Sequence, residues 1–158
     1  MAQVATLIRF LTKRRSAFDA ELEQGLLRIG VLSAIVLYLA GALLFEPTKL
    51  HHLALASTVL FLFIAFGLLV WIAAGKPESR VRKVVGVVCD IGETTYGLLM
   101  FGPTTAPLYV VYLWVIFGNG FRFGTPYLVL ATTLSTLGFA TVIAVHAYWH
   151  DHLPLGIG

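Results

Sequence analysis

The sequence predicts an all-α integral membrane protein, a polytopic helical bundle, from its composition and from the length of its apolar runs. Hydrophobic residues make up 58% of the 158 residues, charged residues make up 12%, and the mean hydropathy is +0.87. A soluble surface needs more charge than this, so many apolar side chains are expected to face lipid. The runs are also too long for strands, lack period-2 alternation and carry glycine and alanine freely, which is typical of membrane helices.

Five apolar windows approach the length of about 20 residues that a bilayer-crossing helix needs. They cover residues 26–45, 53–74, 84–101, 107–121 and 127–149, and turn or charge signals separate them. Residues 153–158 read as the beginning of another apolar helix, so we expect five complete spans plus the start of a sixth. The connections between the windows are short, and recognition is therefore expected in the bilayer, at its rims or in the N-terminal arm.

The positions of lysine and arginine predict the orientation, because basic residues are retained on the cytoplasmic side during insertion. With the N-terminus inside, ten of the eleven basic residues lie on one side, and Lys49 is the exception. The rival placement, with the N-terminus outside, puts those ten residues on the opposite face. The sequence therefore favours residues 1–25 as a cytoplasmic, basic and amphipathic arm, followed by a transmembrane domain over residues 26–158.

Two acidic residues, Asp90 and Glu93, lie within the third predicted span. A carboxylate at membrane depth costs roughly 2.5 to 3.5 kcal/mol on an insertion scale, so such residues normally face protein or water. Gly86 and Gly97 share their helical stripe and would let a neighbouring helix approach closely. The stripe is either a structural polar seam that locks helix packing or a seam that also senses a ligand, and both interpretations stay open.

Arg122 follows the fourth window and is expected at the membrane edge where the third span begins. Its long side chain can reach back into the membrane, and Asp90 lies about 9 Å deep at 1.5 Å per residue. An ion pair between Asp90 and Arg122 is therefore predicted, with Arg28 as the rival partner for the carboxylate. If these two side chains pair, a double-mutant cycle will show coupling between them.

Small and polar residues interrupt the apolar run just before Arg122. Gly118 and Gly120 would give a neighbouring helix room to pack. Asn119, between them, could bond a backbone carbonyl or Glu93. The alternative is a helix end with a basic anchor on the cytoplasmic side, which needs the arginine but no particular partner for the asparagine.

Aromatic residues gather near the predicted outer ends of the fourth and fifth spans. Tyr109, Tyr112 and Trp114 belong to the fourth, and Tyr148 and Trp149 to the fifth. These positions suit an interfacial aromatic belt. The alternative is that Tyr109 and Tyr112 line a pocket for a lipid-like ligand.

All five histidines fall on the predicted outer side, and His146 and His150 have helical i, i+4 spacing. Without a cysteine pattern or a His-Glu-x-x-His arrangement, a wetted helix end is favoured over a metal site or a pH-responsive rim. We predict no metal and no cofactor. The chain has no phosphate loop, nucleophile elbow or acid/base pair in a soluble cleft, so it is not expected to be an enzyme itself. Nucleic-acid binding is not expected either, because membrane topology accounts for the basic residues.

One stretch carries a family resemblance. The sequence APLYVVYLWVIFGNGFRFG, residues 106–124, resembles the membrane input region of the diffusible-signal-factor sensor kinases, the RpfC-type hybrid histidine kinases of Gram-negative bacteria. The sequence ELEQGLLRI, residues 21–29, is similar to that family's acidic segment before the first span, and Asp90 is a further match. The resemblance implies an inner-membrane receptor for cis-2-unsaturated fatty-acid quorum signals that controls a cytoplasmic histidine kinase. Family members are described with the N-terminal segment outside, opposite to the placement that the charges favour.

The resemblance also implies partners and a site. We expect a homodimer in contact with membrane lipids, and a response regulator reached through output domains that this chain lacks. A fatty acid would enter from the lipid, with its carboxylate held at the inner rim (Arg28, Asn119 and Arg122) or at the outer rim (Lys49, His51, His52 and His146). The predicted ligand or signalling residues are Glu21, Glu23, Gln24, Arg28, Asp90, Glu93, Tyr109, Tyr112, Asn119 and Arg122.

The sequence is also compatible with three other functions. A small proton- or cation-coupled transporter or channel subunit could use Asp90 and Glu93 as its carriers. The region could equally be the sensor module of a nucleotide cyclase, since related membrane modules are fused to such outputs. A structural anchoring subunit would tolerate neutralisation of both acids.

Overall fold

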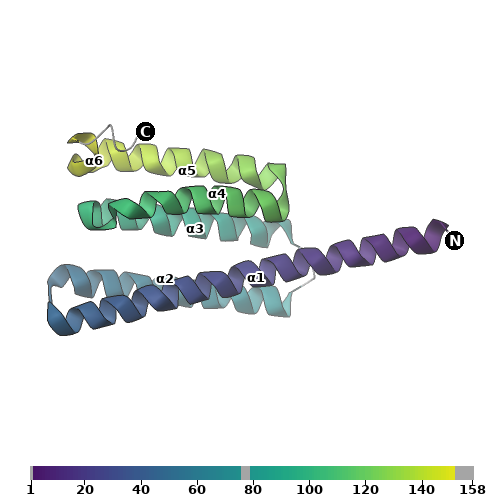
Figure 1. The fold of residues 1–158 in the computed structure, drawn as a ribbon, viewed down its shortest axis with the longest axis horizontal. Helices are drawn as coiled ribbons and strands as arrows, with labels where there is room; N and C mark the ends of the chain where they lie inside the picture. Colours follow the sequence, from purple (N-terminus) through teal and green to yellow (C-terminus); the bar gives the residue numbers. More distant parts are fainter. Residues whose placement is uncertain (1, 76–78, 152–158) are drawn as a thin grey trace. The chain divides into compact units, whose positions relative to one another are not determined.

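The computed structural model describes the backbone of residues 2–75 and 79–151, and most side chains from Ala20 onward. Every element in these ranges is helical, which confirms the predicted all-α class. The elements are, in order, α1 (Ala2–Phe45), α2 (Lys49–Ala74), α3 (Arg80–Phe101), the 3-10 helix η1 (Gly102–Leu108), α4 (Tyr109–Phe123), α5 (Thr125–Val145) and α6 (Ala147–Asp151), as Figure 1 shows. The chain divides into two compact units, Met1–Lys83 and Val84–Gly158.

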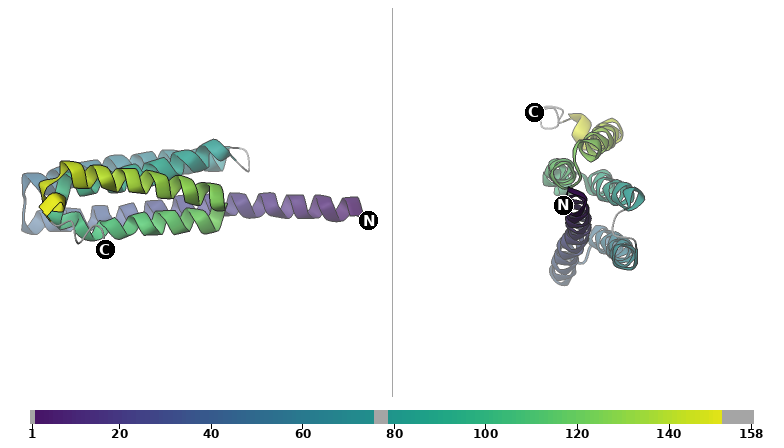
Figure 2. Two further views of the ribbon diagram at one scale, coloured as in Figure 1. Left: turned by 90° about the horizontal axis from the view of Figure 1, so that it is seen from above. Right: turned by 90° about the vertical axis from the view of Figure 1, so that its right-hand side faces the viewer.

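The first unit is an antiparallel pair, in which α2 runs back along α1 (Figures 1 and 2). The turn ends where the Thr48 hydroxyl accepts a hydrogen bond from the His51 backbone N–H at 3.1 Å, capping α2. Gly25 allows close packing, because a Cβ there would lie 2.9 Å from Leu69 Cδ1. The buried hydrophobic side chains of the pair are Leu32, Ala54, Ala65, Leu68 and Ile72. Because α1 is much longer than α2, its N-terminal part continues past the end of the pair.

The second unit contains the rest of α3 and the helices that follow it. In it α4 and α5 pack antiparallel, and α6 packs against α5 and η1. Two glycines with positive φ make the sharp changes of direction: Gly102 (φ +49°) after α3 and Gly124 (φ +90°) between α4 and α5. The core of this unit consists of Val87, Ile91, Leu98, Tyr112, Val115, Ala131, Val142 and Trp149.

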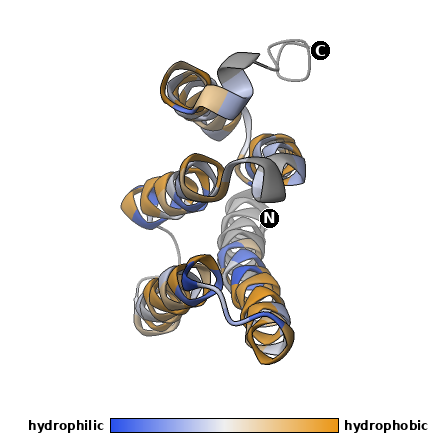
Figure 3. Ribbon diagram, turned by 90° about the vertical axis from the view of Figure 1, so that its left-hand side faces the viewer, coloured by the Kyte–Doolittle hydropathy of each residue, from blue (hydrophilic) through white to orange (hydrophobic). Residues whose placement is uncertain are grey.

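Large apolar side chains cover the helices. Apolar residues lie around much of each helix in Figure 3, and Phe45 and Phe121 are 86% and 87% exposed. Such exposure suits lipid and not water, so the chain is a membrane protein. Four helical segments in the described part of the chain are long and apolar enough to cross a bilayer: Ala20–Phe45, Lys49–Ala74, Arg80–Phe101 and Thr125–Val145.

The predicted total of five complete spans plus the start of a sixth is not confirmed. The fourth predicted window corresponds to α4, which has 15 residues. Such a helix rises about 22 Å at 1.5 Å per residue, short of a hydrocarbon core of about 30 Å. Residues 153–158, the predicted start of a sixth helix, lie outside the described residues.

The observed helix ends differ from the predicted ones where side chains cap the backbone. The third helix begins at Arg80 instead of residue 84, because the Ser79 hydroxyl accepts from the Arg82 backbone N–H at 3.4 Å. The fifth ends at Val145 instead of residue 149, because His146 is extended and its Nδ1 accepts from the Tyr148 N–H at 3.2 Å. The first helix runs unbroken through the predicted arm and the first predicted span. The cytoplasmic placement of that arm stays a prediction.

Candidate functional site

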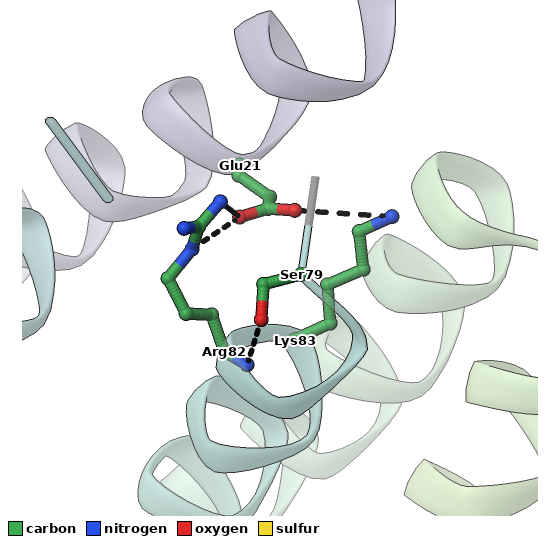
Figure 4. A network of polar contacts seen from close by, with 4 residues as sticks. All are labelled: Glu21, Ser79, Arg82 and Lys83. Atoms are coloured by element: carbon green, nitrogen blue, oxygen red, sulfur yellow. Dashed lines mark hydrogen bonds and ion pairs between the residues drawn. The ribbon is translucent and has the colours of Figure 1, made fainter. Parts of the chain in front are cut away.

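The most distinctive polar feature of the first unit is a buried ion cluster between α1 and the first turn of α3 (Figure 4). Glu21 Oε2 accepts a hydrogen bond from Arg82 Nε at 3.0 Å and forms an ion pair with Arg82 Nη2 at 2.9 Å. Lys83 Nζ lies 3.8 Å from Glu21 Oε1, an ion pair beyond hydrogen-bond distance. All three residues are buried, and Glu21 is 3% exposed. The cluster therefore brings together, within one unit, charged residues that are 61 positions apart in the sequence.

Local structure explains how Arg82 reaches this position. Ser79 starts α3, so Arg82 falls in the first turn of that helix. Gly75 ends α2, and a Cβ on it would overlap Arg82 Nη1 and lie 2.7 Å from the Trp71 carbonyl oxygen. The guanidinium thus lies against the C-terminal end of α2, where the helix dipole favours a positive charge. One side chain contacts α1, the end of α2 and the start of α3.

The cluster has an energetic consequence for the packing of α1. Burying an ion pair requires removing both charges from water, and breaking such a pair by removing one partner is strongly destabilising. Glu21 is predicted from the sequence as a signalling residue, whereas Arg82 and Lys83 are treated there as topology residues. No local sequence signal links them to Glu21, because the contact depends on the return of the chain through α2.

The other predicted residues of α1 do not share this burial. Glu23 is exposed, and Gln24 and Arg28 are half-buried. On a helix, residues four apart share a face, so Glu21 lies on the same face of α1 as Gly25, which packs against Leu69 of α2. The roles of Glu23, Gln24 and Arg28 in signalling stay predictions.

The acidic stripe of α3 lies beside the most buried face of that helix. Asp90 and Glu93 are both half-buried, one position before the buried residues Ile91 and Thr94. The Thr94 hydroxyl donates to the Asp90 backbone carbonyl at 2.8 Å, which satisfies that hydroxyl within the helix. The predicted ion pair of Asp90 with Arg122 stays a prediction.

Two predictions about α4 are confirmed. Asn119 is 1% exposed, and its Nδ2 donates to the Val115 backbone carbonyl at 2.8 Å, one of the two bonds predicted for it. Gly120 gives a neighbouring helix room, since a Cβ there would lie 2.7 Å from Leu128 Cδ1 of α5. Gly118 does not do this for another helix, because the atoms nearest to a Cβ there belong to α4 itself, with Arg122 Nη1 at 3.4 Å. The arginine therefore extends back along α4, as its length led us to expect.

A partly buried hydroxyl pair joins α3 to α4 in the second unit. The Tyr112 and Thr95 hydroxyl oxygens are 2.7 Å apart, and the Thr95 hydroxyl also lies 2.7 Å from the Ile91 carbonyl, to which it donates. Gly138 of α5 makes room for them, because a Cβ there would lie 2.6 Å from Thr95 Oγ1. The sequence singles out Tyr112 but misses Thr95 and Gly138. Two consecutive threonines in an apolar helix were the available signal.

The predicted aromatic belt is wrong for Trp149. It is 2% exposed, and its ring packs on Phe139 at 5.3 Å and on Tyr109 at 6.5 Å between centroids. Tyr109 is 40% exposed and stacks with Phe139. The break at His146 turns α6 back onto α5, which buries the tryptophan instead of leaving it at an interface.

The histidines near the predicted outer ends bind backbone groups. His51 Nδ1 donates to the Glu46 carbonyl at 2.7 Å, and His52 Nδ1 donates to the Thr48 carbonyl at 2.8 Å. A carbonyl can only accept, so the proton is on Nδ1 in both rings. Among the described residues, no group of three or more histidine, cysteine or acidic residues could hold a metal ion. The side chain of His150 and all of His152 lie outside the described part of the chain.

Comparison with known proteins adds one similarity. No protein-family model matches the chain, and no solved structure matches it. The chain is 32% identical over 144 residues to the Sensory/regulatory protein RpfC of Xanthomonas campestris pv. campestris strain ATCC 33913, and the RpfC of strain 8004 gives the same values. The match covers 89% of this chain and 19% of the relative. The chain thus spans about a fifth of the length of the curated relatives that it matches.

Proposed function

Since this chain is homologous to an RpfC-type sensor region, we propose that it is the transmembrane sensor domain of a histidine kinase in the bacterial inner membrane. Its signal is a cis-2-unsaturated fatty acid used in quorum sensing. The region acts as a homodimer surrounded by membrane lipids. It passes the signal through cytoplasmic output domains to a response regulator.

The observation that carries this proposal is the extent of the similarity. It runs through 89% of the chain, so it includes the membrane helices and is not confined to one motif. The matched part of the relative is a fifth of its length, as expected for one module of a larger signalling protein. A sensory protein needs a region that meets the signal, and helices in lipid are suited to an amphiphile that partitions into the bilayer.

The ligand's carboxylate needs a polar partner at one membrane rim. The inner rim, with Arg122 and Asn119, is favoured because the arginine extends back along α4 to Gly118, the residue before the buried Asn119. Loss of the charge in Arg122→Ala should weaken ligand binding if the inner rim holds the head group. The same substitution should leave binding unchanged if the head group is held by Lys49, His51, His52 and His146.

The experiment is a binding measurement with the chain in nanodiscs. A cis-2-unsaturated fatty acid is titrated in parallel with its trans isomer and with the saturated acid of equal length. Saturable binding that is selective for the cis acid is the expected result. Equal partitioning of all three acids without saturation would contradict the proposal.

A transport function is favoured by a different observation, the position of two acids in α3. Asp90 and Glu93 are half-buried at membrane depth, where proton and cation carriers commonly lie. A transporter should move protons or cations across liposomes as the isolated chain. A sensor domain should bind its ligand and produce no flux, so one liposome preparation separates the two functions.

A further inference from the structure

The end of the α1–α2 pair carries a contact that links three helices through one side chain. Arg82 places two nitrogen atoms within 3.0 Å of Glu21 Oε2 on α1, and its Nη1 lies against Gly75 at the end of α2. Arg82 itself belongs to the first turn of α3. We call Glu21, Arg82 and Gly75 the clasp.

The clasp lies at the point where α1 leaves its partner helix. One turn after Glu21, Gly25 packs closely against Leu69 of α2. Residues 2–20 continue α1 beyond the end of α2, as Figure 1 shows. Holding Glu21 therefore sets the axial position of α1 where its long N-terminal part begins, because a helix transmits a displacement along its hydrogen-bonded backbone.

We propose that the clasp is a charge-dependent latch. When closed, it holds α1 at the corner formed by the end of α2 and the start of α3, and an anionic head group opens it. A ligand carboxylate that pairs with Arg82 replaces the Glu21 carboxylate with a group of the same charge and shape. Pairing with the ligand leaves Glu21 with only the longer contact to Lys83, 3.8 Å from its Oε1, so that Glu21 can leave the corner together with α1. The ligand shifts the equilibrium because it binds Arg82 in the open state and not in the closed one. This trigger rests on the proposed function, whereas the latch itself does not.

A disulfide reporter measures the closed state directly. A Cβ on Gly25 lies 4.0 Å from Leu69 Cβ, within the range of about 3.5 to 4.5 Å that disulfides need. The chain with Gly25→Cys, Leu69→Cys and Cys89→Ser should therefore form this disulfide in nanodiscs under mild oxidation. The initial rate of formation reports how closely α1 lies on α2 beside the clasp.

The first arm of the experiment tests the latch without ligand. Glu21→Gln should slow disulfide formation by about fivefold or more, the lower end of typical coupling between sites. Glu46→Gln, an exposed acid at the other end of α1, should leave the rate unchanged. The swap of Glu21→Arg with Arg82→Glu should restore most of the rate, which separates loss of the ion pair from misfolding. Unchanged rates in both Glu21→Gln and Arg82→Gln would overturn the latch.

The second arm tests the trigger. The cis-2-unsaturated fatty acid should slow disulfide formation in the reporter chain, and its uncharged methyl ester should not. If the acid binds saturably but leaves the rate unchanged, the trigger is wrong and the receptor function stands. If the acid does not bind, the proposed function fails while the ligand-free variants still decide whether the latch exists.

Discussion

Glu21 is an acidic residue that the fold removes from solvent, although it lies before an apolar window where a charge could stay exposed. Its carboxylate accepts a hydrogen bond from Arg82 Nε and pairs with Nη2 of the same guanidinium, a charge-assisted arrangement stronger than bonds between neutral groups. Such a group is expected to affect stability more than its neighbours do. Glu23, two positions later, is exposed and has no comparable burial.

Replacing Glu21 with glutamine should destabilise the chain by about 3 kcal/mol, the cost of removing one partner of a buried ion pair. The amide keeps the shape but not the charge that compensates Arg82. The free energy of unfolding can be measured by titration with a denaturing detergent in mixed micelles. Glu46→Gln is the control, because that side chain is exposed and a surface charge contributes little. Equal stability of the two variants would contradict the prediction.

Gly75 is the second residue whose identity matters at the clasp. An alanine there would place its Cβ 2.7 Å from the Trp71 carbonyl oxygen and in overlap with Arg82 Nη1. The backbone must shift to relieve the first contact, and overpacking of this kind costs typically about 1 to 3 kcal/mol. Gly75→Ala should therefore lower the unfolding temperature. Gly67→Ala is a matched control, since nothing lies within 4 Å of its Cβ position and the variant should unfold like the parent.

Among the helices, α3 connects the two units, with its first turn in one and the remainder in the other. Its side chains serve different contacts along its length: Arg82 reaches α1, and Thr95 reaches Tyr112 of α4. The acids Asp90 and Glu93 lie between these two contacts. One continuous helix therefore links the chain of the two units.

The hydroxyl pair between α3 and α4 should show measurable coupling. Thr95→Val and Tyr112→Phe each remove one hydroxyl, and the double variant removes both. A double-mutant cycle on unfolding should give an interaction of about 0.6 kcal/mol or somewhat more, as for hydrogen bonds between membrane helices. Additive effects of the two substitutions would mean that the 2.7 Å contact contributes no net stability.

At the scale of the whole molecule, the charge distribution predicts the side on which each loop lies. In a Cys89→Ser chain, Ser16→Cys should react with an impermeant maleimide only after the membrane is permeabilised. Lys49→Cys should react in intact spheroplasts, because the first inter-helical turn is predicted outside. The reverse labelling pattern would place the N-terminus outside, as the family resemblance implies.

The sequence alone was sufficient for the all-helical class and the membrane environment. These follow from composition, from the length of apolar runs and from local chemistry, all of which can be read within about 20 residues. The partner of Glu21 could not be found this way, because Arg82 is 61 residues away and its basic neighbours already satisfy the topology rule. Trp149 was misplaced for a related reason, since its burial depends on the backbone break at His146. Tertiary structure decided these contacts because the return path of the chain determines which distant side chains share a buried space.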